Sequence, residues 1–404
     1  MKIDEFLSSL LLLNNFEILL KNILKNYKLF NLIIKMKYSL DINNYNNDIY
    51  SDSFSDENVI LMFKLLEKKF YKMVRTYTKK ILNFREEFKS NLNGEYYLII
   101  CDSELNINIF KVFLIFYYTN IKLVKKNYYI GMDLEFNTKV AALIQLNFDI
   151  RSDLHKENLI FIIDPLIFDK GWNSFFIEHI LCRSNVYKIL HGSDSLDLPY
   201  IFKSMLNGER NLIVKFTRSF IDTKFLCEYS YYKNNEQLGK CKIYYILLKE
   251  NVITEKKFKQ LLKNEDKMGP IYDILININN MNENLINYTL YDVVYLYELV
   301  SNYIKKLQDF DLVNEIVRLS ILNKIESYDV VPKIEIDKIN NYLFNFKGKI
   351  IKLIDFFNKI FESFLSKNNL TKVLLNINYI KNLLILIFKY EAYFYICKNN
   401  VVFS

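Results

Sequence analysis

The sequence predicts an α/β protein: a mixed β-sheet with flanking helices, plus mainly helical N- and C-terminal regions. Three short β-type runs separated by polar turns lie between residues 127 and 165. Strand-like and helix-like patterns then interleave, which favours a sheet covered by helices. From residue 296 onward the periodicity is almost wholly helical. We therefore predict a mainly helical region over 1–126, an α/β domain over 127–305 and a helical region over 306–404.

The individual elements follow from local patterns. Residues 1–40 predict one or two amphipathic helices, 41–57 form a polar linker rich in Asn and Asp, and helical periodicity returns over 58–92. Residues 95–126 alternate apolar runs with polar breaks and receive no assignment. The α/β domain is predicted to contain strands YYIGMDLEF, VAALIQLNF and ENLIFIID, a helix near 172–182, a strand over 187–192, a helix from about 195 and a strand ending in FIDT at 220–223.

Composition sets limits on the partners and the compartment. The chain has 404 residues, 51% of them hydrophobic, and a net charge of +8, which permits a polyanionic partner without requiring one. The five cysteines are scattered and include no CxxC pair, so we expect reduced thiols in a soluble intracellular protein, with neither a disulfide framework nor a zinc site. No uncharged apolar run approaches the ~20 residues of a membrane span, so no membrane partner is expected.

The first candidate functional pair is Asp133 and Glu135, in the strand-like run YYIGMDLEFN. Side chains alternate along a strand, so these two carboxylates lie on the same face. Like charges on an apolar strand repel one another, and a bound divalent cation compensates them. Hard cations such as Mg²⁺ prefer oxygen ligands. The alternative is that both carboxylates lie on a solvent-exposed face.

The second candidate segment is HGSDSLDLPYIF at 191–202, where a buried strand gives way to a helix. Asp194 or Ser195 could cap that helix. Asp197 would then lie in its first turn, at the strand ends where α/β sheets present ligands. Alternatively, both acidic residues simply stabilise the helix N-terminus through its dipole.

The third candidate pair is Tyr288 and Asp292, in the helical run YTLYDVVYLYELV. Their i, i+4 spacing places them on one face of a helix. A tyrosine hydroxyl beside a metal-binding carboxylate can orient an attacking water molecule. The alternative is an aromatic core stripe in a chain that contains 31 tyrosines.

The order of these three motifs resembles that of the DEDDy 3′–5′ exonucleases, and most closely the ribonuclease D-like branch. Three further segments strengthen the resemblance, which covers about residues 127–305: Gln145 in VAALIQL, the run FIDTKFLCEY with Asp222 and Thr223, and Gln237-Leu-Gly. The resemblance implies a ribonuclease H-like fold and hydrolysis of RNA or single-stranded DNA from a free 3′ end. It also implies two divalent cations, Mg²⁺ or Mn²⁺, and release of nucleoside 5′-monophosphates.

The resemblance also implies a role for each matched residue. Asp133, Glu135 and Asp292 would hold the cation that activates water, Asp133 would bridge to the second cation with Asp197 in support, and Tyr288 would align the attacking water. Asp222 fits a strand-end residue better than a metal ligand. The chain departs from the family by one extra residue between His191 and Asp197, which makes Asp194 a competitor for the role of Asp197. It also lacks the Trp and Arg-Pro-Leu that often precede the third motif, and segment 203–219 is longer than expected.

Contacts to nucleic acid outside the three motifs are less specific. Lys64, Lys68, Lys72, Arg75 and Lys79 recur at helical spacing and could form a basic track for phosphates, although a solvated surface helix has the same pattern. His191 is another candidate contact, although a structural role near the site suits it better. The terminal helical regions could bind a protein partner or a second copy of the chain. The competing function is a catalytically weak nucleic-acid-binding or assembly module on the same fold.

Overall fold

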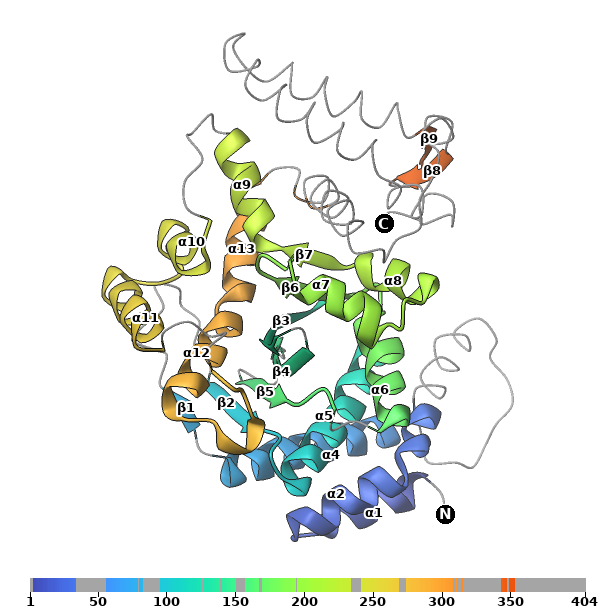
Figure 1. Ribbon diagram of the computed structural model, residues 1–404. Helices are drawn as coiled ribbons and strands as arrows, with labels where there is room; N and C mark the ends of the chain where they lie inside the picture. Colours follow the sequence, from blue (N-terminus) through green and yellow to red (C-terminus); the bar gives the residue numbers. More distant parts are fainter. Residues whose placement is uncertain are drawn as a thin grey trace.

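A computed structural model of the chain describes most of the residues up to 307 and two short segments beyond them (Figure 1). The described residues are 3–33, 56–78, 80–82, 95–124, 126–138, 140–149, 157–166, 169–193, 195–233, 241–268, 274–307, 310, 314, 343–346 and 349–352.

The described residues form a seven-stranded mixed sheet with the order β1-β2-β5-β4-β3-β6-β7. In the centre of the sheet, β4 is antiparallel to both β5 and β3. On one side, β6 is parallel to β3 and β7 is parallel to β6; on the other side, β2 is parallel to β5. The strands are β1 (Lys80–Leu82), β2 (Glu95–Ile100), β3 (Tyr128–Asn137), β4 (Val140–Asp149), β5 (Glu157–Ile163), β6 (Val186–Leu190) and β7 (Phe220–Asp222).

Helices cover both faces of this sheet. The helices are α1 (Ile3–Leu12), α2 (Phe16–Lys25), α4 (Asp56–Tyr77), α5 (Glu104–Leu123), α6 (Lys170–Phe176), α7 (Asp197–Tyr200), α8 (Arg210–Thr217), α9 (Thr223–Lys233), α10 (Ile243–Lys249), α11 (Glu255–Met268), α12 (Glu283–Val294) and α13 (Leu296–Lys306). Shorter helical turns are η1 (Tyr27–Leu29), η3 (Ile177–Leu181), η4 (Ile201–Met205) and η6 (Ile278–Asn280).

Two adjacent residues of β4 show which helix lies on which face. Phe148 packs against Phe113 of α5, with ring centroids 4.7 Å apart. The side chain of Asn147 instead donates hydrogen bonds to the carbonyl oxygens of Val293 and Val294 at the end of α12, at 3.1 and 3.3 Å. Because neighbouring side chains on a strand point to opposite faces, α5 and α12 lie on opposite sides of the sheet.

The N-terminal helices form a further layer on the outside of α5. The buried face of α4 carries Phe63, Leu66 and Phe70, which recur at helical spacing. The rings of Phe63 and Phe70 lie 5.5 and 5.2 Å from the ring of Phe116, on α5. Phe116 is fully buried. This aromatic packing joins the N-terminal region to the sheet through α5.

The structure confirms the predicted α/β class and its strands, and it corrects two helical predictions. Residues 80–82, predicted as helix, form strand β1, because they pair antiparallel with the edge of β2. Residues 95–126, which received no assignment, form β2 and α5. The sheet therefore continues across the boundary that we predicted between residues 126 and 127. Beyond residue 307, the described residues include an antiparallel pair, β8 (Leu343–Phe346) and β9 (Lys349–Lys352), where we expected helix.

Some of the other predicted elements are confirmed, and some lie outside the described residues. The helices predicted over 1–40 and near 172–182 correspond to α1 and α2, and to α6 with the π-helical turn η3. The long segment 203–219 contains the end of η4 and helix α8. The predicted linker 41–57 lies almost wholly outside the described residues. In the described part of the chain, no helix is long and apolar enough to cross a bilayer.

Helix α12 approaches the sheet closely at Gly131 of β3. A Cβ atom at this position would lie 2.9 Å from the carbonyl oxygen of Val293, which is closer than real Cβ atoms come to a backbone atom. Asn147 lies opposite Gly131 in the β3–β4 pair, and its side-chain amide donates a hydrogen bond to the same carbonyl oxygen. The glycine therefore allows α12 to lie directly on β3.

The substitution Gly131→Ala tests this close approach. Replacing glycine by alanine in a strand normally stabilises a protein slightly, because it restricts the unfolded chain. At Gly131 we expect the opposite, a loss of about 1–3 kcal/mol, because overpacking displaces α12. Urea unfolding followed by circular dichroism measures the change, and an equal or higher free energy of unfolding would contradict the packing described above.

Candidate metal centre

Asp133 and Glu135 lie on β3, on the face covered by α12. In the β3–β4 pair, Asp133 lies opposite Gln145 and Glu135 lies opposite Leu143. The register shifts immediately after Glu135. Glu135 is buried and Asp133 is half-buried. The structure thus agrees with the prediction that both carboxylates share a face, and that face is covered by a helix.

Asp292, which is distant in the sequence, lies close to these two carboxylates. It lies in α12, which begins after the cap residue Asn282, whose side chain accepts a hydrogen bond from the Leu285 N–H. One carboxylate oxygen from each of Asp133, Glu135 and Asp292 lies within 4.8 Å of the other two. Three carboxylates this close could hold a metal ion, and we call them the acidic centre.

The electrostatics of the acidic centre favour a cation. Burial raises the pKa of Asp133 to about 7. Burial also raises the pKa of Glu135 well above its usual range, and the carboxylates of Asp133, Asp292 and Asp197 raise it further. The pKa of Asp292 is raised by burial and by Asp133. Each group resists ionisation because its neighbours are acidic and little water reaches it, and a bound cation would reverse this effect.

Asp197 and Tyr288 interact electrostatically with the acidic centre. Asp197 is the first residue of the short helix α7, and its carboxylate contributes to the raised pKa of Glu135. The pKa of Tyr288 is raised mainly by Asp292 and by burial, with smaller contributions from Glu135 and Asp133. Tyr288 lies in the middle of α12, one turn before Asp292.

The cap predicted at Asp194 or Ser195 is not at the N-cap position of the helix. That position is occupied by Leu196, which has no polar side chain to cap α7. Asp194 itself lies outside the described residues. The prediction that Asp197 occupies the first turn of the helix is confirmed, because α7 begins at Asp197.

Two side chains support the carboxylates from behind. The hydroxyl of Tyr244, on α10, donates to Oδ1 of Asp292 at 3.3 Å. The amide of Gln145, which is fully buried, donates to Oε1 of Glu135 at 3.3 Å. Gln145 belonged to the predicted pattern. Tyr244 was missed, because one tyrosine among many gives no signal before the fold brings α10 next to α12.

Asp222 organises the loop that leads to Asp197. It ends β7, and its carboxylate accepts hydrogen bonds from the Gly192 and Ser193 N–H groups, the Ser193 hydroxyl and the N–H groups of Lys224 and Phe225. This confirms its expected role as a strand-end residue. It fixes the loop that follows β6, which in turn holds α7 at the end of the sheet.

His191 lies in the same loop and is held in a neutral state. Its Nδ1 atom forms a 2.9 Å hydrogen bond with the hydroxyl of Thr223. Burial lowers the pKa of His191 to about 4. The imidazole is therefore uncharged near neutral pH. This agrees with a structural role for His191, because a neutral ring cannot form an ion pair with a phosphate group.

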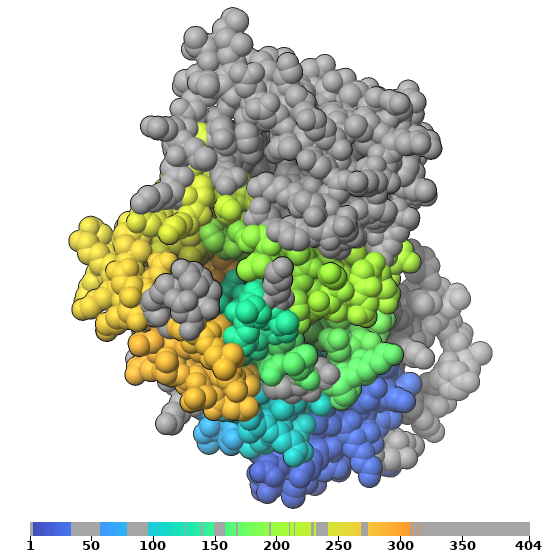
Figure 2. Space-filling view, viewed as in Figure 1, coloured from blue at the N-terminus to red at the C-terminus, as the bar shows by residue number. Residues whose placement is uncertain are grey.

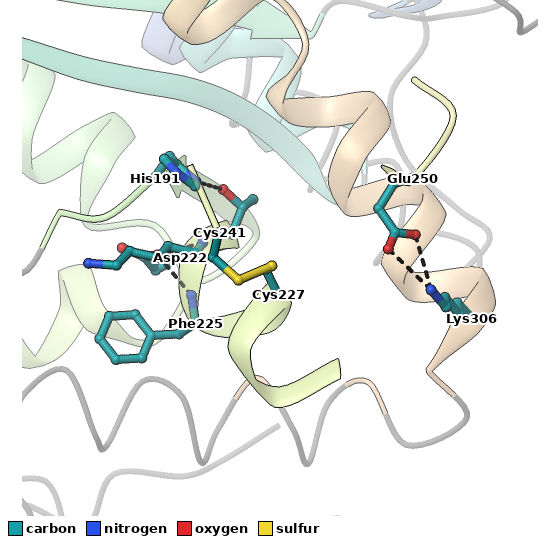
Figure 3. Close-up of a disulfide and its surroundings, with 9 residues drawn as sticks. His191, Asp222, Phe225, Cys227, Cys241, Glu250 and Lys306 are labelled. Atoms are coloured by element: carbon teal, nitrogen blue, oxygen red, sulfur yellow. Dashed lines mark hydrogen bonds and ion pairs between the residues drawn. A yellow bond between two sulfur atoms is a disulfide. The ribbon is translucent and has the colours of Figure 1, made fainter. Parts of the chain in front are cut away.

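A disulfide joins Cys227 of α9 to Cys241, which lies just before α10 (Figure 3). This finding overturns the expectation of reduced thiols for these two residues, whereas Cys101 and Cys182 are free and buried. The sequence could not indicate the pair, because the two cysteines meet only when α9 and the start of α10 are packed beside the His191 loop. The Cys241 backbone also hydrogen-bonds to His191.

The predicted basic track lies on α4. Lys64, Lys68 and Lys72 are exposed on this helix. Arg75 is half-buried and donates to the backbone oxygen of Tyr71 at 3.3 Å. Lys79 lies outside the described residues. Because α4 covers α5, the track lies on the opposite side of the sheet from α12 and Asp292.

Comparisons with known proteins give a relative but no activity. No family model matches the chain. The chain is 36% identical to uncharacterized protein L533 of Acanthamoeba polyphaga mimivirus in an alignment of 264 residues, which covers 58% of this chain. The match covers 51% of that protein, so the chain spans about half the length of this viral relative.

Metal binding at the acidic centre predicts a rise in thermal stability. A ligand present at about 100 times its Kd stabilises the folded state by about 2.7 kcal/mol. We expect Mg²⁺ or Mn²⁺ to raise the thermal midpoint and EDTA to reverse the rise. The variant Asp292→Asn should lose this response, yet melt higher than wild type without metal, because an amide is buried beside acidic groups at a lower cost than a carboxyl group that can ionise. Glu283→Gln, at the exposed start of the same helix, is the control, and an equal metal response in both variants would refute the site.

The disulfide predicts a stability that depends on reduction. Closing a loop of about 15 residues contributes about 3 kcal/mol in the chain-entropy model. We expect dithiothreitol to lower the unfolding free energy of the wild type by about 2–4 kcal/mol. The double variant Cys227→Ser/Cys241→Ser should have the lower value with or without reductant, which controls for the other cysteines of the chain. Wild-type curves that coincide in oxidising and reducing buffer would count against the bond.

Proposed function

We propose that the chain is a metal-dependent 3′–5′ exonuclease acting on RNA or single-stranded DNA. The observation that carries this proposal is that the carboxylates of Asp133 and Glu135 lie within 4.8 Å of that of Asp292. The first and third motifs are far apart in the sequence, and the sequence predicted metal-binding carboxylates in each of them. The proposal is also supported by Asp197 of the second motif and Tyr288 of the third, because Asp197 contributes to the raised pKa of Glu135 and the three carboxylates contribute to the raised pKa of Tyr288.

The strand arrangement supports a ribonuclease H-like core for residues 127–305. Within the larger sheet, strands β5, β4 and β3 form an antiparallel group, and β6 and β7 extend it in parallel from β3. Asp133 and Glu135 lie on the central strand of these five, and Asp197 follows the strand beside it. Figure 2 shows the surface of β3 and β4 between the α10–α12 side and the α6–α8 side of the molecule.

The donor set suits divalent metal ions such as Mg²⁺ or Mn²⁺, which prefer carboxylate oxygens. Asp133, Glu135 and Asp292 would hold one cation, and Asp197 would help Asp133 to hold a second. When bound, such cations neutralise the charge that develops on a phosphodiester during hydrolysis and lower the pKa of water. The raised pKa values of these carboxylates fit this interpretation, because burial and mutual repulsion oppose their ionisation and a bound cation would favour it.

The protein's own groups would position the reactants. Tyr288 stays protonated, because neighbouring carboxylates and burial raise its pKa, and its hydroxyl can orient the attacking water by hydrogen bonding. Tyr244 fixes one oxygen of Asp292 and Gln145 fixes one oxygen of Glu135, which limits their rotation. No covalent enzyme intermediate is needed, and the products would be nucleoside 5′-monophosphates.

A degradation assay tests this proposal. Purified protein is incubated with 5′-labelled single-stranded RNA and DNA in Mg²⁺, Mn²⁺ or EDTA. We expect a ladder that shortens from the 3′ end only with metal, and its rate on the two substrates gives the preferred sugar. Asp133→Ala/Glu135→Ala should lose at least about 100-fold in rate, because the cations are no longer held. Tyr288→Phe should lose about 10- to 100-fold, because a hydrogen bond to a charged group contributes about 1.5–3 kcal/mol and each 1.36 kcal/mol changes the rate tenfold.

The controls separate the competing functions. Glu283→Ala removes an exposed carboxylate from α12 and should leave the rate unchanged. Binding of both substrates without degradation by any variant would favour the catalytically weak binding or assembly module. Degradation that persists in Asp133→Ala/Glu135→Ala would place the activity elsewhere and refute the assignment of the acidic centre.

A further inference from the structure

A cavity lies on the other side of the sheet from Asp292, between the N-terminal helices and α6. Its volume is about 630 Å³. The residues that matter for its chemistry come from η1, α5, α6 and η3, and they are Tyr27, Lys28, Tyr118, Lys122, Phe175 and His179. Figures 1 and 2 show the N-terminal helices, in dark blue, against α6, in green. The proposed exonuclease function uses none of these residues.

One wall of this cavity is aromatic. The ring of Phe175 lies 5.4 Å from Tyr118 and 6.4 Å from Tyr27, and the ring of His179 lies 5.2 Å from Tyr118. Trp172 supports the wall from α6, with its ring 5.7 Å from Tyr27. All except the exposed His179 are half-buried. Interacting rings of this kind offer flat faces and edges to a further aromatic group.

Positively charged side chains lie beside the same aromatic wall. Lys28 is exposed on η1, and the half-buried Lys122 has its Nζ atom 5.9 Å from the ring of Tyr118. Burial lowers the pKa of Lys122, and the nearby Arg183 lowers it further. Burial also lowers the pKa of His179; Glu178 opposes this shift, and Arg183 and Lys122 add to it. Positive groups that repel one another beside a cavity are stabilised by an anion.

The remaining polar lining can recognise hydrogen-bonding groups. Glu178 offers carboxylate oxygens, which accept hydrogen bonds from amino or hydroxyl groups. Asn31 and Ser174 can each donate and accept. A ligand with an aromatic ring, a sugar or amino group, and a phosphate would use all three kinds of surface. A purely structural aromatic cluster needs no such cavity, because protein interiors otherwise pack closely.

We propose that this cavity is a nucleotide-binding site. The nucleobase lies against the aromatic wall of Tyr118 and Phe175, and the phosphate is held by Lys28 and Lys122. The nucleotide is either free or the phosphorylated end of a strand, since both present the same groups. The site is independent of the acidic centre, because α5 and the sheet separate them, and it does not require the chain to be a nuclease.

Trp172 provides a direct probe, because it is the only tryptophan in the chain and contacts the wall of the cavity. The full-length protein is titrated in EDTA with adenosine and uridine 5′-monophosphates, and calorimetry checks the fluorescence. We expect a saturable fluorescence change, retained in Asp133→Ala/Glu135→Ala. Lys122→Ala and Lys28→Glu should each weaken binding at least tenfold. Lys305→Glu, an exposed lysine on α13, is the matched control and should bind as the wild type does.

Comparing the affinities of several ligands shows which chemical groups the cavity recognises. We expect the nucleotides to bind more tightly than adenosine or inorganic phosphate. If inorganic phosphate binds as tightly as the nucleotides, the cavity is a phosphate site and the proposal is overturned. A 5′-phosphorylated oligonucleotide that binds more tightly than the free nucleotide identifies a strand end as the source, and the reverse order identifies a free nucleotide.

The proposal fails if no nucleotide binds saturably, or if binding is unchanged in both lysine variants. Because Lys28 is exposed, Lys28→Glu remains informative even if Lys122→Ala does not fold. Loss of exonuclease activity in Asp133→Ala/Glu135→Ala with nucleotide binding intact would separate the two sites. Absence of nuclease activity in the wild type would leave this result unaffected.

Discussion

The contact between α12 and β3 is the constraint on which the acidic centre depends. Gly131 leaves room for the carbonyl oxygen of Val293, and the amide of Asn147 binds that carbonyl and the next one. The contact occurs at the end of α12, immediately after Asp292. It therefore fixes the distance from Asp292 to Asp133 and Glu135, which no local interaction within either element could do.

This arrangement has an energetic consequence. Burying three carboxylates beside one another costs free energy, and the raised pKa values of Asp133, Glu135 and Asp292 reflect that cost. Strand pairing and apolar packing around the centre must hold the groups together against their repulsion. Such a concentration of acidic groups with raised pKa values is typical of a functional site, and it does not stabilise the fold.

The loop that presents Asp197 depends on a different set of interactions. Asp222 collects hydrogen bonds from the loop and from the start of α9, while the disulfide ties α9 to the segment before α10. Three residues after Cys241, Tyr244 contacts Asp292. The two sides of the acidic centre are thus linked through α9 and α10, although these helices contribute no carboxylate to it.

The sequence by itself determined the local features: the alternation that places Asp133 and Glu135 on one face, the helix spacing of Tyr288 and Asp292, and the strands from 128 to 163. These follow from periodicities that adjacent residues display. Only the tertiary structure decided that Lys80–Leu82 join the sheet as a strand, that Cys227 reaches Cys241, that Tyr244 supports Asp292, and that a cavity opens beside Tyr118 and Lys122. Each of these depends on residues brought together from distant segments, and no pattern along a single element records which partners will meet.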